Sequence, residues 1–143
     1  MSDETIDPRY SIGVPEMDRE HARWIALIEA FRSAAAGHLT DARGISAARL
    51  ALEQLSAYTR QHFASEERLL AQCHYPELGA HQTKHHELAA AVAKLAQEIE
   101  EQHGTTAPLK LNLFVTVWLL EHIMSEDWKY ARFIIGQRGQ APA

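Results

Sequence analysis

The sequence is poor in the features that mark several large classes of protein. It has a single cysteine, Cys73, which excludes an intramolecular disulfide and makes a reducing, cytoplasmic setting the expectation. It has no run of about 20 apolar residues, so we expect no membrane-spanning helix. The opening segment MSDETIDPRY is polar and acidic and lacks the apolar centre of a signal peptide, so none is expected.

Positive charge is also scarce. The 14 Lys and Arg residues are outnumbered by 19 Asp and Glu, the formal net charge is −5, and no basic run occurs. Nucleic-acid binding requires a basic face toward the phosphates, so no nucleic-acid partner is expected. Hydrophobic residues make up 46% of the 143 residues, enough for a globular domain with its own core.

Strand-type alternation is missing as well, and helical periodicity takes its place. Apolar residues recur every three or four positions in four segments, at about residues 16–36, 45–73, 77–103 and 108–135. Gly37, Pro76, Gly104 and Gly136 separate or end them. The sequence therefore predicts an all-α fold, an up-down-up-down four-helix bundle. Residues 1–143 are expected to form one domain, with an N-terminal arm at 1–15 and a disordered tail at 136–143.

Histidine is abundant, with nine residues in the chain. Seven side chains of metal-binding type are distributed over all four predicted helices: His21 on the first, His62 and Glu66 on the second, His81 and His85 on the third, and His122 and Asp127 on the fourth. A four-residue step leaves an angular offset of about 40° on an α-helix. The pairs on the second and third helices can therefore each point at one site inside the bundle.

Five imidazoles and two carboxylates are too many ligands for one ordinary metal ion. They suit two ions about 3–4 Å apart, with the carboxylates bridging. Nitrogen and oxygen ligands without thiolate favour iron or manganese over structural zinc. With three histidines on one ion and two on the other, one coordination position stays open, and dioxygen can bind there.

The spacing on the fourth helix does not fit a regular α-helix. His122 and Asp127 are five residues apart, which would separate their side chains by about 140°. If both belong to one site, the helix must be distorted there, through a π-bulge or a break. The remaining histidines, His38, His74, His86 and His103, are assigned no ligand role. Cys73 is interpreted as a packed thiol at a helix end.

The order and spacing of these motifs resemble the hemerythrin family, in particular the single-domain bacteriohemerythrins. The family pattern is a lone His followed by HxxxE, HxxxH and HxxxxD. The chain reads DREH at 18–21, HFASE at 62–66, HQTKH at 81–85 and HIMSED at 122–127. The flanking words IGVPEMDREH and VWLLEHIMSEDWKY also match, so the resemblance covers about residues 10–135.

The resemblance implies two non-haem iron ions joined by an oxo or hydroxo bridge. His81, His85 and His122 would hold one iron, His21 and His62 the other, and Glu66 and Asp127 would bridge them. Dioxygen would bind at the open iron as a hydroperoxide. Apolar residues around that position would hinder the loss of superoxide or peroxide, and the matching positions are Trp24, Phe63, Trp118, Leu119 and Ile123. Trp24 departs from the smaller Leu or Ile common there.

By this resemblance the expected function is reversible dioxygen binding for storage, delivery or carriage, without enzymatic activity beyond a weak side reaction. Dioxygen is the expected ligand, an oxygen-using enzyme or a signalling protein a candidate partner, and a monomer or weak homo-oligomer the expected state. Two alternatives stay open: an oxygen or redox sensor acting through a separate partner, and a diiron oxidase or peroxidase. Ferritin-like diiron enzymes use two Glu-x-x-His motifs, whereas only Glu100 to His103 fits that spacing here.

Overall fold

The computed structural model of the chain describes residues 6–102 and 106–139, all of them in helices and their connections. A short 3₁₀ turn, η1 (Pro8–Tyr10), precedes three long helices, α1 (Pro15–Ala35), α2 (Ala42–Gln72) and α3 (Leu78–Gln102). The chain then runs without interruption through α4 (Ala107–Phe114), η2 (Val115–Leu119), α5 (Leu120–His122), η3 (Ile123–Asp127) and α6 (Trp128–Gly139). We refer to residues 107–139 as the C-terminal rod.

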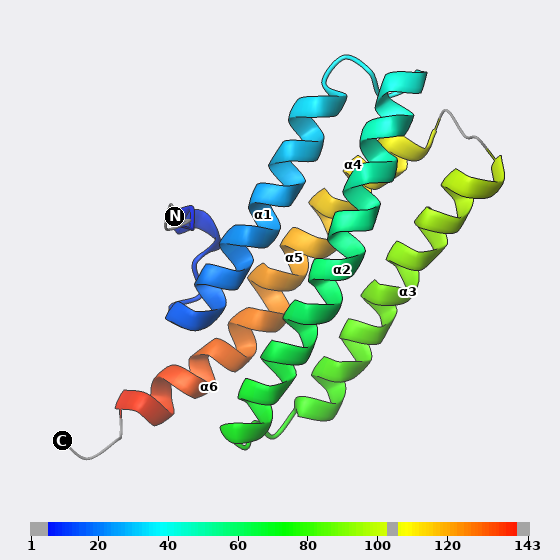
Figure 1. Cartoon of the computed structure of the whole chain (residues 1–143). Helices are drawn as coiled ribbons and strands as arrows, with labels where there is room; N and C mark the ends of the chain where they lie inside the picture. Colours follow the sequence, from blue (N-terminus) through cyan, green and yellow to red (C-terminus); the bar gives the residue numbers. More distant parts are fainter. Residues whose placement is uncertain (1–5, 103–105, 140–143) are drawn as a thin grey trace.

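These elements form a four-helix bundle. Figure 1 shows α1, α2, α3 and the C-terminal rod side by side and alternating in direction, so the topology is up-down-up-down. The described residues include no β-strand. The predicted all-α bundle is therefore confirmed. None of the described helices combines the length and apolar character that crossing a bilayer requires.

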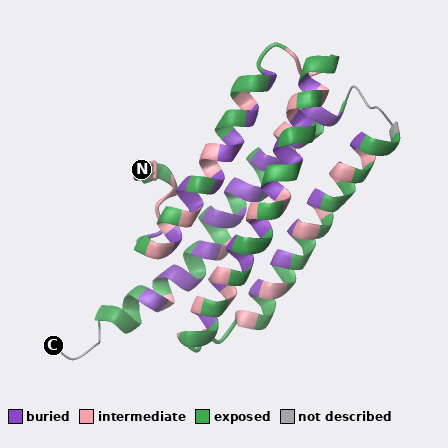
Figure 2. Cartoon of the chain, in the orientation of Figure 1, coloured by how far each residue is buried: buried purple, intermediate pink, exposed green. Residues whose placement is uncertain are grey.

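The hydrophobic core occupies the space enclosed by the four rods, where Figure 2 shows the buried faces of neighbouring helices turned toward one another. Ile28, Leu55 and Leu111 are each at most 1% exposed. The N-terminal arm contributes Ile12 and Val14, which are equally buried. Removing such side chains from water is the main source of stability of the bundle.

Polar contacts fix where the first helices begin. Asp18 accepts hydrogen bonds from the Ile12 amide (2.9 Å) and the Ser11 hydroxyl (2.6 Å), which ties the arm to the first turn of α1. Helix α2 begins at Ala42, three residues before the predicted start, because the Asp41 carboxylate caps it by accepting from the Gly44 amide (3.1 Å). A Cβ atom at Gly44 would lie 1.7 Å from the His38 carbonyl oxygen, so only glycine fits this turn.

The turn between α2 and α3 reverses the chain within a few residues. His74 has φ of 56°, in the left-handed region, directly after the last residues of α2. Helix α3 begins at Leu78, one residue after the predicted start. Its predicted end at His103 and Gly104 lies outside the described residues.

The C-terminal end of the chain departs from the prediction. Helix α6 continues to Gly139, so a disordered tail beginning at residue 136 is wrong for 136–139. Two contacts hold this last turn: Arg138 forms an ion pair with Glu16 of α1 (2.8 Å), and the Gln137 amide donates to the Cys73 carbonyl (3.1 Å). Residues 140–143 lie outside the described residues.

Candidate metal centre

The seven candidate ligands from four separate helices meet in the middle of the bundle. His21 comes from α1, the 62/66 pair from α2, the 81/85 pair from α3, and the 122/127 pair from the C-terminal rod. All seven side chains are buried, none more than 5% exposed. Burial of so many ionisable groups in one place is costly unless they bind one another or a metal ion.

The donor atoms fall into two groups that share both carboxylates. One group consists of His81, His85 and His122, and the other of His21 and His62; Glu66 and Asp127 belong to each. Within a group, the donor atoms all lie within 4.8 Å of one another. Two adjacent groups with shared carboxylates are the arrangement that a pair of metal ions requires.

Glu66 divides its two oxygens between the groups. Its Oε1 lies 2.7 Å from His81 Nε2 and 2.9 Å from His85 Nε2. Its Oε2 lies 3.4 Å from His62 Nε2 and 3.5 Å from His21 Nε2. A carboxylate in this position can give one oxygen to each of two ions.

Asp127 divides its oxygens in the same way. Its Oδ1 lies 3.0 Å from His122 Nε2 and 3.2 Å from His81 Nε2, whereas its Oδ2 lies 3.0 Å from His21 Nε2. The two carboxylates therefore stand between three imidazoles on one side and two on the other.

A π-helical turn brings His122 and Asp127 into the same site. Residues Ile123–Asp127 form the π-turn η3, in which residues five apart lie on one face. The predicted distortion of the fourth helix is thus confirmed. A second π-turn, η2 (Val115–Leu119), was not predicted, because no pair of ligand-type residues marks it in the sequence.

The inner atoms of the cluster are left without hydrogen bonds. Both oxygens of Asp127 and the Nε2 atoms of His21, His62 and His122 are buried and have no hydrogen-bond partner, although other cluster atoms lie about 3 Å away. Buried polar atoms are rarely left so, and bound metal ions would satisfy all of them together. The residues present therefore fit a metal centre.

Carboxylates outside the cluster orient two of the imidazoles. Glu20 accepts from His62 Nδ1 (2.8 Å) and from the Ser65 hydroxyl (2.6 Å). Glu67 accepts from His85 Nδ1 (2.9 Å). A carboxylate on Nδ1 leaves Nε2 free to bind a metal and raises its basicity. The sequence analysis did not predict a role for either residue. The one feature that could have indicated it is their position, because Glu20 precedes His21 and Glu67 follows Glu66.

Tyr130 is a third missed residue. It is fully buried, and its hydroxyl donates to Glu66 Oε2 at 2.8 Å. Burial, together with the negative charge of Glu66, holds the pKa of the Tyr130 phenol well above its usual value of 10. Tyr130 therefore remains a neutral donor that fixes the orientation of the Glu66 carboxylate.

In the metal-free cluster the two carboxylates and three of the histidines shift one another's pKa values. Burial opposes the charge of three of the histidines, but the carboxylates outweigh it: they raise the pKa of His62 to about 10 and that of His81 to about 9, and they also raise the pKa of His21. The histidines in turn hold the pKa values of Glu66 and Asp127 below their usual range. Metal binding must therefore displace protons from His62 and His81.

Four of the five predicted pocket residues are buried around the cluster. The Phe63 ring stacks on His85 with centroids 3.7 Å apart, and the Trp24 ring centroid lies 5.2 Å from that of His62. Leu119 and Ile123 are fully buried. The Trp24 Nε1 atom is buried without a hydrogen-bond partner.

Trp118 is the exception, because it lies at the surface with 60% of its area exposed. It precedes His122 by four residues, about one helical turn, and His122 itself lies at the rim of the cluster, 5% exposed. Trp118, one turn before His122, therefore lies on the same side of the rod but farther toward the surface. It lines a surface groove and is not buried against the cluster as the prediction required.

The other histidines lie away from the centre. His74 and His86 are exposed, and His38 pairs with Asp41 at the start of α2 (2.8 Å). His103 lies outside the described residues. Glu126 pairs with Lys129 (3.2 Å), and Cys73 is a partly buried free thiol.

Together these features define a four-helix bundle with a buried histidine and carboxylate cluster able to hold metal. The family model of the hemerythrin HHE cation binding domain matches residues 12–134. A bacteriohemerythrin from Stenotrophomonas maltophilia is 28% identical over 85% of this chain and 74% of its own length. A bacteriohemerythrin from Pseudomonas aeruginosa is 30% identical over 82% of this chain and 72% of its own length. A myohemerythrin from Riftia pachyptila is 34% identical over 56% of this chain and 60% of its own length. The chain belongs to the hemerythrin family.

Proposed function

We propose that the chain is a non-haem diiron protein that binds dioxygen reversibly, for storage, delivery or carriage, and that it is not an enzyme. The observation that carries this proposal is the division of Glu66 and Asp127 between two groups of imidazoles. His81, His85 and His122 would hold one iron ion, His21 and His62 the other, and the two carboxylates both. When bound, the iron pair would supply the electrons that dioxygen binding requires.

The two groups contain different numbers of histidines, which supports binding of an external ligand at the group with fewer. Three imidazoles stand on one side of the shared carboxylates and two on the other, so the second ion has one protein ligand fewer. The Trp24 ring lies on that side, with its centroid 5.2 Å from that of His62. The Phe63 ring lies between the two groups, stacked on His85 with centroids 3.7 Å apart and with its centroid 5.9 Å from that of His62. These buried rings exclude water, which favours dioxygen over more polar ligands.

The residues around the centre hold protons in defined places. Glu20 and Glu67 keep His62 and His85 protonated at Nδ1, so that Nε2 is available. Tyr130 keeps its phenolic proton and donates a hydrogen bond to Glu66. The preponderance of histidine over carboxylate among the ligands and the burial of the centre favour binding dioxygen over activating it.

Location and assembly complete the proposal. One hemerythrin-like domain accounts for residues 12–134, the part matched by the family model. The single cysteine supports a cytoplasmic setting, and we propose a monomer or weak homo-oligomer that supplies dioxygen to an oxygen-using enzyme.

An anaerobic optical titration tests this function. The iron-loaded protein is reduced under inert gas, dioxygen is admitted, and the visible spectrum is followed while the gas is removed again. A charge-transfer band that appears with dioxygen and fades on degassing supports reversible binding. Prompt and irreversible oxidation would instead favour a redox sensor or an oxidase.

A further inference from the structure

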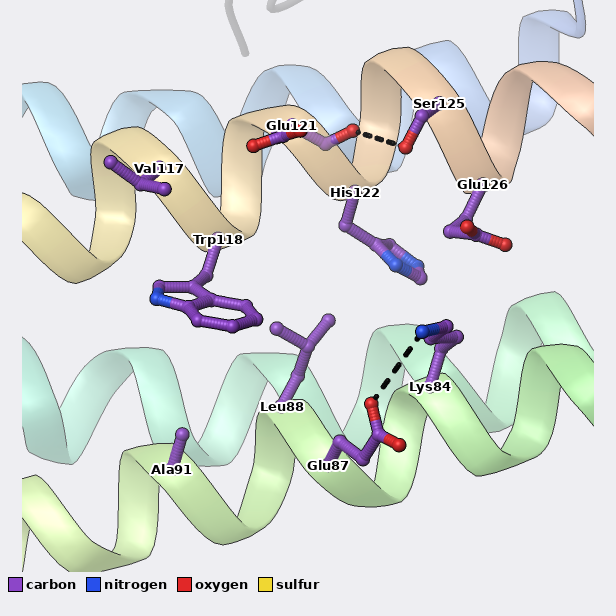
Figure 3. A pocket seen from close by; sticks show the side chains of 10 residues that line it. All are labelled: Lys84, Glu87, Leu88, Ala91, Val117, Trp118, Glu121, His122, Ser125 and Glu126. Carbon is purple, nitrogen blue, oxygen red and sulfur yellow. Dashed lines mark hydrogen bonds and ion pairs between the residues drawn. The ribbon is translucent and has the colours of Figure 1, made fainter.

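The metal centre approaches the surface at one described groove. This groove, of about 590 Å³, lies between α3 and the C-terminal rod, and we call it the His122 groove. Figure 3 shows the His122 ring reaching into it from the rod, with Leu88 and Lys84 opposite on α3. His122 is the most exposed of the seven cluster residues, at 5%. A molecule seated there would contact an edge of a proposed iron ligand.

The groove has the character of a contact surface. Trp118 and Val117 are 60% and 48% exposed and form an apolar half together with Leu88 and Ala91. Exposed aromatic residues beside apolar ones are typical of interface centres. A second described groove, of about 320 Å³ between Leu52 and Ile99, includes none of the seven cluster residues.

The charged half of the groove is acidic. Glu87 forms an ion pair with Lys84 (3.8 Å), and Glu126 forms one with Lys129 (3.2 Å). Glu121, next to His122 in the chain, has no ion-pair partner among the described residues and is exposed. The chain as a whole carries a formal charge of −5. Both the local and the overall charge attract a cationic partner.

The groove is on the wrong side of the centre to be the path by which dioxygen reaches the open coordination position. It reaches the group of three histidines, and its lining includes neither His21 nor His62. A dioxygen molecule needs the open position proposed on the other side. An electron donor needs only close approach to the edge of a ligand, because an outer-sphere transfer forms and breaks no bond.

We propose that the His122 groove is where electrons enter the centre, from a small, positively charged one-electron donor. The inference rests on the proposed diiron function. Each donor loses one electron through the His122 edge, and two successive encounters reduce two ferric ions to two ferrous ions. Trp118 and Val117 supply the apolar contact, and Glu121 attracts the donor.

Binding at the groove can be tested without iron. Hexaamminechromium(III), a redox-inert paramagnetic cation, is titrated into the metal-free, ¹⁵N-labelled protein. We expect selective broadening of the Trp118 indole signal and of the Glu121 and Ser125 amides. Broadening centred elsewhere, or spread evenly over all exposed carboxylates, would overturn the inference and leave the oxygen titration and the proposed function untouched.

Reduction kinetics test the electron transfer itself. Glu121→Lys is compared with Glu53→Lys, which makes the same charge change on an exposed position at the second groove. With hexaammineruthenium(II) and the diferric protein at low salt, we expect Glu121→Lys to slow reduction about 3- to 10-fold and the control to have a much smaller effect. With anionic dithionite, Glu121→Lys should accelerate reduction.

Salt and iron content provide the remaining controls. The difference between the two variants should shrink toward zero as ionic strength rises, because screening removes the attraction. Equal iron content in both variants confirms that the centre is intact. Equal slowing by both variants, or slowing of both donors by Glu121→Lys, would contradict electron entry at this groove.

Discussion

Replacing Tyr130 by Phe isolates the contribution of one buried hydrogen bond to the centre. The substitution removes only the hydroxyl that donates to Glu66 Oε2 at 2.8 Å, in a fully buried position. A hydrogen bond to a charged group contributes about 1.5–3 kcal/mol. We therefore expect the metal-free protein to lose about that much free energy of unfolding, a fall in Tm of about 5–12 °C for a chain of this size.

Urea unfolding followed by tryptophan fluorescence measures this loss, and an unchanged m value shows that compactness is preserved. Tyr75→Phe is the matched control, because its hydroxyl makes only a long, exposed contact with Glu77 (3.4 Å). The control should change stability by less than about 0.5 kcal/mol. An equally small effect of Tyr130→Phe would refute the claim that this phenol stabilises the Glu66 carboxylate.

Four further predictions follow from other contacts. Stability of the metal-free protein should fall as pH rises from 6.5 to about 10, because His62 (pKa about 10) and His81 (pKa about 9) lose protons that the folded state stabilises; denaturant titrations across pH should show no such fall in the metal-loaded protein. Phe63→Ala, which removes a buried ring stacked on His85, should cost about 3–5 kcal/mol in urea unfolding, well above partly buried Phe133→Ala. Glu20→Ala should weaken metal affinity about 10- to 100-fold in competition with a chelator, with helicity by circular dichroism unchanged. Arg138→Ala should lower stability by less than about 1 kcal/mol in thermal melting, because both members of its pair with Glu16 are partly exposed.

The bundle and the convergence of the seven candidate ligands were predictable because both follow from periodicity. Residues four apart on a helix share a face, and four amphipathic segments with short loops have few ways to bury those faces. Even the π-turn at Ile123–Asp127 could be inferred, since His122 and Asp127 cannot share a face on a regular α-helix. The second π-turn at Val115–Leu119 left no such signal.

What the sequence did not reveal depends on contacts between distant segments. Tyr130 and Glu66 are 64 residues apart, and no local pattern links the phenol to the carboxylate. The last turn of α6 continues through Gly136, and there Arg138 pairs with Glu16 of α1, 122 residues away in the chain. Trp118 was assigned to the oxygen pocket because its position matches the family pattern, but a matching position does not show how near the surface that part of the helix lies.

The central claim is a pair of iron ions joined by Glu66 and Asp127, and iron content combined with low-temperature electron paramagnetic resonance tests it most directly. The account predicts two irons per chain and a silent spectrum in the oxidised protein, because two ferric ions sharing bridges couple antiferromagnetically. One iron per chain, or the signal of isolated ferric ions, would contradict it.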